Sequence, residues 1–440
     1  MMKKIIFSAI LLALPAIGFA QEAAEAAPKL DSGNTAWILA ATMLVMLMTI
    51  PGLAFFYGGM VRRKNVLSVM MQCVVLTAVI TIEWIVYGYT AVFGTGFSGG
   101  WLGEIIGGFD KIFLHGVDKD ALTSGNIPEV LFALFQCKFA VITPALIVGA
   151  FAERIKFSGF LLFSLIWAVL VYNPLAHWVW GGGWMQRMGA LDFAGGTVVH
   201  INAGVSALVM ALMLGRRKGY GTSMILPHNV PFVVLGTALL WLGWFGFNAG
   251  SGLGADGLAA NAFLVTHLAT SVAATTWMAL EWIINKKPTI IGICTGAVAG
   301  LVAITPAAGS SDAVGALFIG LIAAVICFIS VAYVKPKLKY DDSLDAFGVH
   351  GVGGFVGAIL TGVFASKLIT GEAQGALYGD WHQLWVQALV NSVTVVFSAA
   401  MTFILFMIVD KTVGLRVNSS DESIGLDISQ HGEIAYHDGE

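Results

Sequence analysis

The chain has 440 residues, of which 58% are hydrophobic and only 11% are charged, and its mean hydropathy is +0.84. An ordinary soluble protein carries about 25% charged residues, so 23 basic and 26 acidic side chains are too few to cover a soluble surface of this size. The net charge of -3 gives no basis for binding nucleic acid. Composition therefore indicates a protein solvated by lipid and excludes nucleic-acid binding, soluble catalysis and disordered scaffolding.

The first 20 residues have the pattern of a cleaved secretory signal peptide. Two lysines are followed by the apolar run 5–16 and by small residues that end at Ala20. A membrane span needs about 20 apolar residues, so this run is too short for the alternative, a first transmembrane helix. We predict a signal peptide over 1–20, cleaved near Ala20, and a short periplasmic N-terminus over 21–34.

Eleven later apolar stretches are long enough to cross about 30 Å of hydrocarbon. The predicted spans cover residues 35–61, 67–93, 129–153, 157–178, 197–215, 229–250, 255–284, 289–308, 311–334, 344–366 and 384–410. With an external N-terminus, 15 basic residues fall on the predicted inner side and six on the outer side, as the positive-inside rule requires. The sequence therefore predicts an all-α, multi-pass protein of a bacterial inner membrane, with a cytoplasmic C-terminal tail over 411–440.

Two pairs of similar segments lie five predicted spans apart. Residues 52–59 in the first span resemble residues 243–250 in the sixth, and both segments are rich in glycine and aromatic residues. Residues 191–200, which lead the fifth span, resemble residues 344–350, which lead the tenth. Membrane sequences of this composition can match by chance, but two matches in the same order favour a true repeat.

The odd number of spans in each repeat places the two halves in opposite orientations across the membrane. We predict a first five-span repeat over 35–215 and a second over 229–366, around a central pore, with a peripheral eleventh helix over 384–410. Inverted repeats of this kind commonly place a substrate site near the midplane, where the halves meet.

His200 and His350 lie inside apolar spans, each in the fifth span of its repeat. The repeat axis is expected to bring them together at mid-depth, where a histidine is costly and therefore indicates function. Two hydrogen-bonded imidazoles could share a proton, because each ring nitrogen can donate or accept. The alternatives are a structural histidine bonded to a neighbouring helix, and a metal site. We expect no metal and no cofactor, because no third histidine or cysteine shares the symmetry.

Asp192 and Asp345 precede these histidines at the ends of the fifth and tenth spans. A carboxylate suits the N-terminus of a helix, so capping is the first expectation for both. Asp345, on the predicted inner side beside Asp341 and Asp342, could equally make a cytoplasmic contact. Asp192, on the predicted outer side, could also favour a cation or hold a loop.

Aromatic side chains gather toward the predicted outer ends of the spans. The group contains Phe135, Phe139, Trp178, Trp180, Trp244, Phe245 and Phe247. An interfacial aromatic belt explains most of its members, but Phe247 and Ser251 end the repeated motif of the sixth span and are expected above the histidine pair. An aromatic face attracts a desolvated cation by about 2 kcal/mol, and a serine hydroxyl could accept a hydrogen bond from an N–H group.

Long motifs carry a resemblance to one membrane-protein family. They are residues 49–59, 181–183 with 192–202, 243–251 and 345–353. Through these motifs the chain resembles the Amt/Mep/Rh ammonium transporters, specifically the bacterial Amt branch, from the signal peptide to the tail. The resemblance implies a homotrimer in the lipid bilayer, with one narrow pore for ammonium or ammonia, and for methylammonium, through each subunit. It implies a transporter that supports nitrogen assimilation and not an enzyme.

The resemblance also implies how the substrate enters the pore. Phe139, Trp180 and Ser251 correspond to the outer site that recruits ammonium. Phe139 and Phe247 correspond to two stacked phenyl rings that close the pore below that site.

Further residues correspond to the lining and support of the pore. His200 and His350 match the twin histidines below the phenyl rings. Asp192 matches an aspartate that supports the outer site without touching the substrate, and Phe135 is the neighbouring aromatic of the same turn as Phe139. Lys138 would repel ammonium if it pointed into the pore mouth, so we expect it to face away or extend outward.

The C-terminal tail also resembles that of the bacterial family. The similar segments, 410–416 and 425–433, imply docking on the cytoplasmic face and control by a trimeric PII signalling protein. Two other functions stay open. One is an ammonium sensor with little transport, against which the absence of a signalling domain before Glu440 argues, and the other is a membrane-embedded metalloenzyme that uses the histidines.

The free-energy cost of desolvating an ion favours removal of the proton before the substrate passes the histidines. Moving a bare ion into a low-dielectric pore costs on the order of 20 kcal/mol, whereas cation–π attraction returns only about 2 kcal/mol or slightly more. Ammonium and potassium are similar in size, so selection must use the N–H donors or the proton. The expected route deprotonates ammonium between the phenyl pair and His200 and moves neutral ammonia past the histidines.

Overall fold

The computed structural model describes residues 29–436 of the chain. The predicted signal peptide over 1–20, and residues 21–28 of the predicted N-terminal segment, lie outside this range. Within it, eleven helical segments are long and apolar enough to cross a membrane, which confirms the predicted all-α, multi-pass architecture. They cover Ser32–Met60, Arg63–Phe93, Glu129–Phe151, Phe157–Arg187, Gly196–Leu214, Val230–Gly250, Gly257–Asn285, Ile290–Ala307, Ala313–Leu338, Phe347–Phe364 and Trp381–Thr412.

Several spans are divided into shorter helices. The first five spans contain α1 (Ser32–Leu47), α2 (Ala54–Met60), α3 (Val66–Glu83), α4 (Tyr89–Phe93), α5 (Glu129–Phe151), α6 (Phe157–Trp167), α7 (Asn173–Trp180), α8 (Trp184–Arg187) and α9 (Asn202–Leu214). The next five contain α10 (Val230–Gly250), α11 (Gly257–Asn285), α12 (Ile290–Ile304), α13 (Ala313–Ile329), α14 (Lys335–Leu338) and α15 (Val352–Phe364). After them come α16 (Lys367–Thr370), α17 (Trp381–Thr412) and α18 (Ser419–Ile424). The strands β1 (Leu122–Thr123) and β2 (Ile127–Pro128) pair antiparallel.

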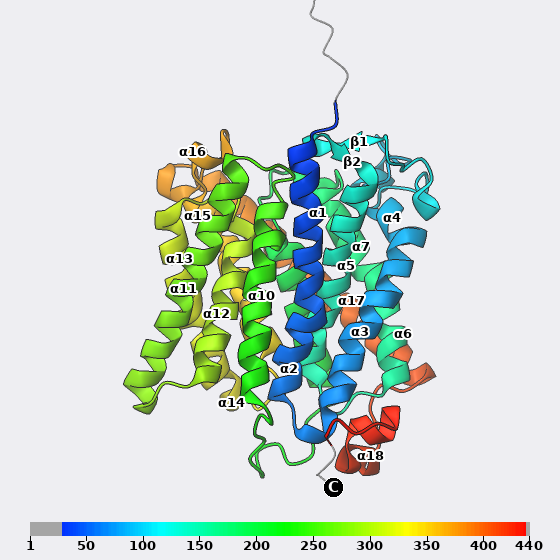
Figure 1. Cartoon of the computed structure of the whole chain (residues 1–440), viewed down its shortest axis with the longest axis vertical. Coiled ribbons are helices and arrows are strands. Elements are labelled where there is room, and N and C mark those ends of the chain that lie inside the picture. The colour runs from blue at the N-terminus through cyan, green and yellow to red at the C-terminus, as the bar shows by residue number, and fades with distance from the viewer. Residues whose placement is uncertain (1–28, 437–440) are drawn as a thin grey trace, which may run out of the picture.

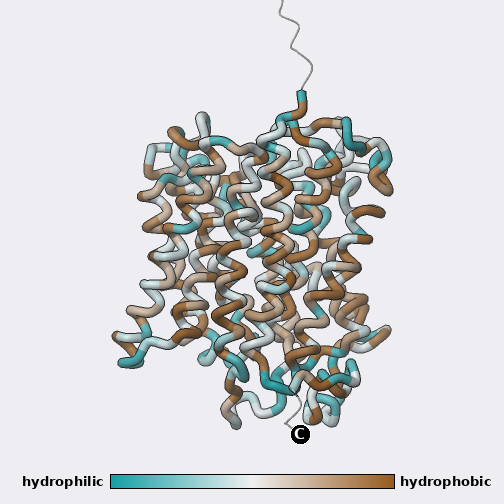
Figure 2. The backbone as a smooth tube through the Cα atoms, in the orientation of Figure 1, coloured by the Kyte–Doolittle hydropathy of each residue, from teal (hydrophilic) through white to brown (hydrophobic). Residues whose placement is uncertain are grey.

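The spans stand side by side in one bundle, and the connecting segments form two opposite faces (Figure 1). The upper face in Figure 1, here called the loop face, carries β1, β2 and α16, whereas the lower face, here called the tail face, carries α14 and α18. Apolar residues run across the middle of the bundle, and hydrophilic residues gather at its two ends (Figure 2). Many exposed side chains of the spans are large and apolar, among them Met43, Leu264 and Val396, as a surface solvated by lipid requires.

Glycines let the two halves approach closely at the centre of the bundle. A Cβ atom on Gly204 of α9 would lie 2.0 Å from the amide nitrogen of Gly351. A Cβ atom on Gly354 of α15 would lie 2.9 Å from the Cβ atom of His200. Small residues at helix crossings are the usual means of close packing in membranes, and here they bring the two histidine-bearing segments together.

An aspartate caps the start of each of the two histidine-bearing segments. The carboxylate of Asp192 accepts hydrogen bonds from the amides of residues 195–198, at 2.6–3.0 Å. The carboxylate of Asp342 accepts hydrogen bonds from the amides of Ala346 and Phe347, at 3.1 and 2.8 Å. Each aspartate lies eight residues before a histidine. In both halves a buried carboxylate therefore satisfies the free N–H groups at the start of the helical segment.

The predicted pairing of Asp345 with Asp192 is wrong. The side chain of Asp345 forms an ion pair with Lys335 and does not cap the segment. Its backbone adopts a left-handed conformation, with φ 61°, and it corresponds to Gly195, with φ 112°, three residues after the capping aspartate. Asp342 is the counterpart of Asp192, because both repeats turn through a left-handed residue between the carboxylate and the helix.

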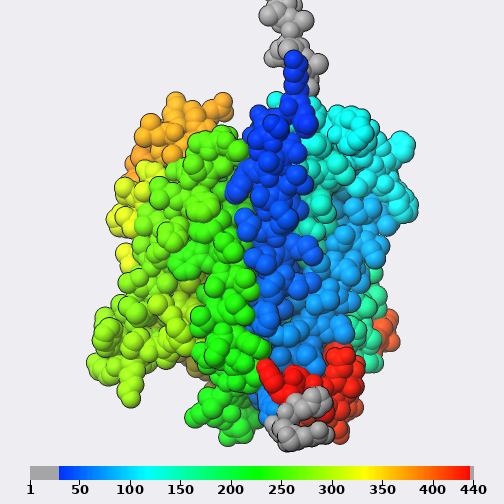
Figure 3. Space-filling model, viewed as in Figure 1, coloured from blue at the N-terminus to red at the C-terminus, as the bar shows by residue number. Residues whose placement is uncertain are grey.

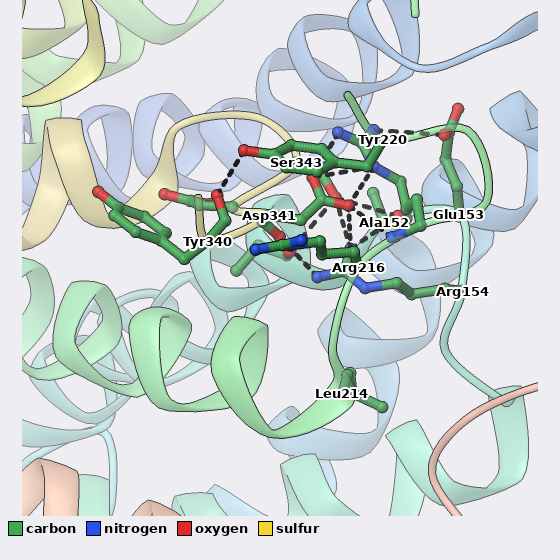
Figure 4. Close-up of polar contacts among 12 residues, drawn as sticks. Ala152, Glu153, Arg154, Leu214, Arg216, Tyr220, Tyr340, Asp341 and Ser343 are labelled. Carbon is green, nitrogen blue, oxygen red and sulfur yellow. Dashed lines mark hydrogen bonds and ion pairs between the residues drawn. The ribbon is translucent and has the colours of Figure 1, made fainter. Parts of the chain in front are cut away.

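Buried ion pairs join the two halves at the tail face (Figure 4). Arg217 lies between two carboxylates, with Nη2 2.8 Å from Oδ1 of Asp341 and Nη1 3.3 Å from Oε2 of Glu153. Arg154, which is fully buried, donates to the carbonyl oxygen of Asp341 at 2.6 Å and to the Ser343 hydroxyl at 2.7 Å. Burial favours the neutral acids, but the hydrogen bonds and charge of Arg217 overcome it at Asp341, and the charges of Arg217 and Arg62 with the hydrogen bonds of Arg62 overcome it at Glu153, so that both pKa values lie below their usual range.

Replacing Arg217 with methionine is expected to destabilise the protein by about 3–5 kcal/mol at neutral pH, because the buried carboxylate of Asp341 loses its hydrogen-bonded partner and that of Glu153 keeps only Arg62. With folded pKa values below the unfolded ones, these carboxylates contribute stability above about pH 4 and lose it as the pH falls further. The difference between variant and parent should therefore shrink in acid. Thermal unfolding in detergent across pH measures this, with Arg216→Met, at an exposed position, as the control. An unchanged Arg217→Met melting curve contradicts the assignment.

The C-terminal tail is docked on the tail face (Figure 3). The amide of Leu426 donates to the side-chain oxygen of Asn65 at 2.8 Å, and the amide of Ser68 donates to the carboxylate of Asp427 at 2.8 Å. A buried Glu422 accepts from Arg416 at 3.0 Å. The tail therefore contacts the beginning of the second span through specific polar bonds.

Candidate functional site

The predicted gate residues pack against each other, with tilted rings, between α5 and α10. The rings of Phe139 and Phe247 have centroids 4.3 Å apart and an interplanar angle of 31°. Phe139 is 1% exposed and Phe247 is 0% exposed, so the two rings close the space between the helices. Phe135, one turn before Phe139, packs edge-on against it with centroids 5.1 Å apart.

Trp180 lies on the loop-face side of this pair. Its ring is edge-on to Phe139, with centroids 5.9 Å apart. Its indole N–H donates to the backbone carbonyl of Asp192 at 2.8 Å, so its only donor is occupied and its ring position is fixed. What Trp180 can still offer to a ligand is the π-face of the ring.

Asp192 organises the segment that holds Trp180 without exposing its charge. It is 7% exposed, and both carboxylate oxygens are occupied by the four backbone amides described above. Burial raises the pKa of Asp192 above its usual value, although the four N–H groups oppose this effect. Its geometry is that of a capping residue.

Ser251 lies at the end of α10, one turn after Phe247. Its hydroxyl donates to the carbonyl oxygen of Phe247 at 2.8 Å. Since the hydroxyl hydrogen is used inside the protein, the oxygen retains lone pairs that can accept a hydrogen bond from an N–H group.

His200 and His350 face one another below the phenyl pair. Their Nδ1 atoms are 3.3 Å apart, and the rings are nearly parallel, with centroids 5.3 Å apart and an angle of 17°. His200 also lies 6.1 Å from the Phe247 ring and stacks on Trp244 at 5.3 Å. The predicted juxtaposition of the two histidines is therefore present in the structure.

The shared hydrogen bond makes the two imidazoles chemically different. When both rings are neutral, one Nδ1 must donate and the other must accept. The first ring then has an unprotonated Nε2 and the second has an Nε2–H group. Nε2 of His200 is buried without a protein partner. The pair can thus present one acceptor and one donor, so it can take up a proton on one ring and release one from the other.

A small cavity lies beside the histidines, enclosed by the two repeats. Its volume is about 10 Å³, roughly the space that a single water molecule requires. It is lined by Met48, Leu53, Phe56, Ile142, Leu146, Val199, His200, Leu240, Trp244, Phe247, Val298 and His350. The histidines are thus the only ionisable groups among these lining residues. Such a space admits a molecule of the size of ammonia or water and offers no charged side chain to an ion.

Sequence reasoning assigned Trp244 to the interfacial belt, but it lies inside the pore wall. Its indole N–H donates to the Thr305 hydroxyl at 2.8 Å, which holds the ring flat under His200. The sequence feature that could have indicated this place for Trp244 is its position in the motif of the sixth span, 243–250, which repeats residues 52–59. Lys138, by contrast, is buried and does not line the cavity. Within residues 29–436, the structure contains no group of three or more His, Cys, Asp and Glu residues placed to hold a metal ion.

The fold and the site together define a multi-pass membrane protein with two inverted five-span halves and a histidine-lined cavity between them. The family model described as Ammonium Transporter Family matches residues 36–436. An ammonium transporter of Bacillus subtilis (strain 168) is 50% identical over 411 residues, which cover 93% of this chain and 100% of that protein. The chain therefore belongs to the ammonium transporter family, as its motifs indicated.

Solved structures show the same architecture. The crystal structure of Saccharomyces cerevisiae Mep2 aligns with a TM-score of 0.85 at 33% identity, covering 93% of each chain. A structure described as a sensor Amt protein aligns with a TM-score of 0.83 at 31% identity, covering 91% of this chain and 98% of that one. The fold is therefore shared by relatives whose descriptions differ in function.

Proposed function

We propose that this chain transports ammonium, and also methylammonium, through the pore between its two halves. One observation carries the proposal: a closely packed phenyl pair, Phe139 and Phe247, lies next to two imidazoles whose Nδ1 atoms are 3.3 Å apart. The rings block a hydrated ion, and the imidazoles below them can exchange a proton. A pore of this kind passes a substrate that can release its own proton.

Recruitment takes place at the loop face, on an outer site formed by Phe139, Trp180 and Ser251. The faces of the two aromatic rings attract the cation, and the Ser251 oxygen accepts one of its N–H groups. Asp192 supports the site by fixing the indole N–H of Trp180 through its backbone carbonyl. Phe135 buttresses Phe139 from one turn away.

The proton leaves between the phenyl pair and His200. The N–H bond of ammonium breaks, the electron pair stays on nitrogen as ammonia, and the proton goes to the unprotonated imidazole nitrogen. This removes the cost of about 20 kcal/mol that a bare ion would meet in a low-dielectric pore. The imidazole pair then releases a proton from its other ring toward the tail face and becomes neutral again, and ammonia, having passed His350, regains a proton there.

Flux through purified protein tests this function against a sensor role and a metalloenzyme role. We expect saturable uptake of radiolabelled methylammonium into proteoliposomes, inhibited by ammonium and absent from protein-free vesicles. Ligand binding without uptake would favour the sensor. Stoichiometric metal in elemental analysis of the purified protein would favour the enzyme.

Replacing Trp180 with leucine is expected to raise the half-saturation concentration for methylammonium by roughly 5- to 30-fold, the effect of losing about 1–2 kcal/mol of cation–π attraction. Uptake at saturating substrate should change much less. Trp178→Leu is the matched control, because that indole bonds to Ile105 and packs on Phe397, away from the outer site. An unchanged half-saturation concentration for Trp180→Leu would remove this ring from recruitment.

We further propose that the functional unit is a homotrimer in a bacterial inner membrane, with the loop face periplasmic. An apolar groove of about 370 Å³ is lined by Trp37, Ala249, Ala259 and Phe263, among others. His267 is exposed in the middle of α11, and a histidine facing lipid is costly. Packing of a second copy of the chain against α1, α10 and α11 would cover the apolar groove and remove His267 from lipid. Native mass measurement tests the trimer, and a reporter fused after residue 436 tests the orientation.

The docked tail supports the proposal that a PII signalling protein regulates transport from the tail face. Its bonds to Asn65 and Ser68 hold it beside the loops that such a partner would contact. Co-purification of the PII protein with the full chain, and its loss when residues 411–440 are removed, is the expected result.

A further inference from the structure

Lys335 binds the backbone of the capping aspartate in the second half, as Trp180 does in the first. Its Nζ atom donates to the carbonyl oxygen of Asp342 at 2.9 Å, and the indole of Trp180 donates to the carbonyl oxygen of Asp192 at 2.8 Å. Each donor comes from the span before the cap, the ninth for Lys335 and the fourth for Trp180. These spans are five apart, so the two side chains occupy related places in the inverted repeat.

The two donors differ in what they leave for a cation. The indole of Trp180 donates from the edge of its ring, so its π-face stays open to a cation. Lys335 ends in a methylene and an ammonium group, which together have the chemistry of methylammonium. This ammonium contacts the Asp342 carbonyl oxygen and the Asp345 carboxylate, two acceptors that a free alkylammonium ion would also bind. The inner counterpart of the outer site therefore holds an ammonium group of the chain itself.

The ion pair that Asp345 forms with α14 lies between the histidine cavity and the tail face. Phe56 of α2 lines that cavity, and Tyr57 follows it in the chain. A Cβ atom on Gly149 would lie 2.7 Å from Cζ of Tyr57 and 3.2 Å from Cβ of Ala346, the residue after Asp345. The helix α14 is itself on the tail face (Figure 1). The ion pair is therefore at the tail-face end of the path that passes the histidines.

This ion pair is open to the tail face, unlike the buried pairs around Arg217. The side chains of Lys335 and Asp345 are 19% and 26% exposed, whereas the Arg217 side chain is 6% exposed and bonds to the fully buried carboxylates of Asp341 and Glu153. A cation from the tail-face solution can therefore reach the Asp345 carboxylate without any change in the buried network.

We propose that the Asp342 carbonyl and the Asp345 carboxylate form an inner ammonium site, which Lys335 occupies as a tethered ligand. Substrate that arrives from the tail face must displace the Lys335 ammonium, so loading from this face needs a higher concentration than the site alone would require. The driving force for transport is unchanged, because Lys335 affects only binding at one face. The effect on flux rests on the proposed transport function, whereas the site itself does not.

Thermal unfolding in detergent tests the site without any transport. Lys335→Ala removes Cε and Nζ of the lysine, and these are the two heavy atoms that methylammonium would restore beside Asp345. A ligand that binds only the folded state raises the melting temperature. We expect methylammonium chloride to raise the melting temperature of Lys335→Ala by about 2 °C more than that of the parent. Potassium chloride at the same ionic strength should produce no such difference.

Two further variants identify the acceptor and guard against misfolding. Lys335→Ala combined with Asp345→Asn removes the carboxylate but keeps a residue that tolerates the left-handed backbone at this position, so the extra stabilisation should disappear. Lys335→Met is one heavy atom shorter than lysine and leaves room for ammonium, so it tests the site with ammonium chloride if the alanine variant does not fold. Equal effects of the ligand on variant and parent, or of potassium and the ligand on the variant, overturn the proposal.

Uptake into membrane vesicles that expose the tail face tests the effect on flux. We expect the half-saturation concentration of Lys335→Ala for methylammonium to be roughly ten-fold below that of the parent, the size that one charge-assisted hydrogen bond gives. Vesicles that expose the loop face should give the parent value. Lys337→Ala, at an exposed position of α14, is the matched control and should resemble the parent on both faces.

An unchanged tail-face half-saturation concentration in Lys335→Ala overturns the role of Lys335 in loading from this face. If methylammonium stabilises Lys335→Ala as expected but the parent carries no methylammonium flux, the proposed transport function fails and the inner ammonium site does not.

Discussion

Replacing both His200 and His350 with aspartate is expected to abolish discrimination against potassium and to slow methylammonium uptake. A carboxylate about 4 Å from a cation stabilises it by about 4 kcal/mol at an effective dielectric constant of 20, which corresponds to roughly a thousand-fold higher occupancy. The pore would then favour ions over ammonia and lose the imidazole pair that exchanges the proton. Uptake of radiolabelled methylammonium and rubidium into the same proteoliposomes measures both effects.

A pair of alanine substitutions is the matched control for this experiment. His200→Ala with His350→Ala also removes both imidazoles but adds no charge, so neither ion should be stabilised and uptake of both should be low. A double-aspartate variant that keeps the full rate and full selectivity would show that the histidines do not relay the proton.

Replacing Asp192 with alanine is expected to have the largest effect on the outer half of the pore. Four buried N–H groups lose their acceptor, and bonds to a charged group contribute about 1.5–3 kcal/mol each without being additive. We expect a loss of about 4 kcal/mol in stability, together with displacement of Trp180, whose indole bonds to the Asp192 carbonyl. Thermal unfolding in detergent and methylammonium uptake measure the two consequences.

Asp192→Asn separates capping from charge. Its amide oxygen can still accept from the amides of Gly195 and Gly196 that bond to Oδ1, whereas the acceptor of the other two amides is lost. An intermediate stability is therefore expected. If Asp192→Ala melts and transports like the parent, the carboxylate does not hold this segment.

The spans could be predicted from composition because their information is local. A stretch of apolar residues indicates by itself that it lies in lipid, and the number of residues it needs is set by the thickness of the hydrocarbon layer. The histidine pair could be predicted because the two repeats place His200 and His350 at equivalent positions, and an odd number of spans fixes their relative orientation. Neither inference required knowledge of any side-chain contact.

Other parts of the site depend on contacts between distant segments. The shared Leu-Asp dipeptide favours Asp345 as the counterpart of Asp192, although the eight-residue spacing to the histidine identifies Asp342. Trp244 was assigned to the belt because composition does not say which way a ring faces.

Uptake of radiolabelled methylammonium and rubidium by the unmodified protein is the most direct test of deprotonation in the pore. Methylammonium can release a proton between the phenyl pair and His200, whereas rubidium, an ion of similar charge and comparable size, has no proton to release. We expect saturable methylammonium uptake, with rubidium uptake no higher than in protein-free vesicles. Rubidium entering through the protein at a comparable rate would contradict deprotonation as the basis of selectivity.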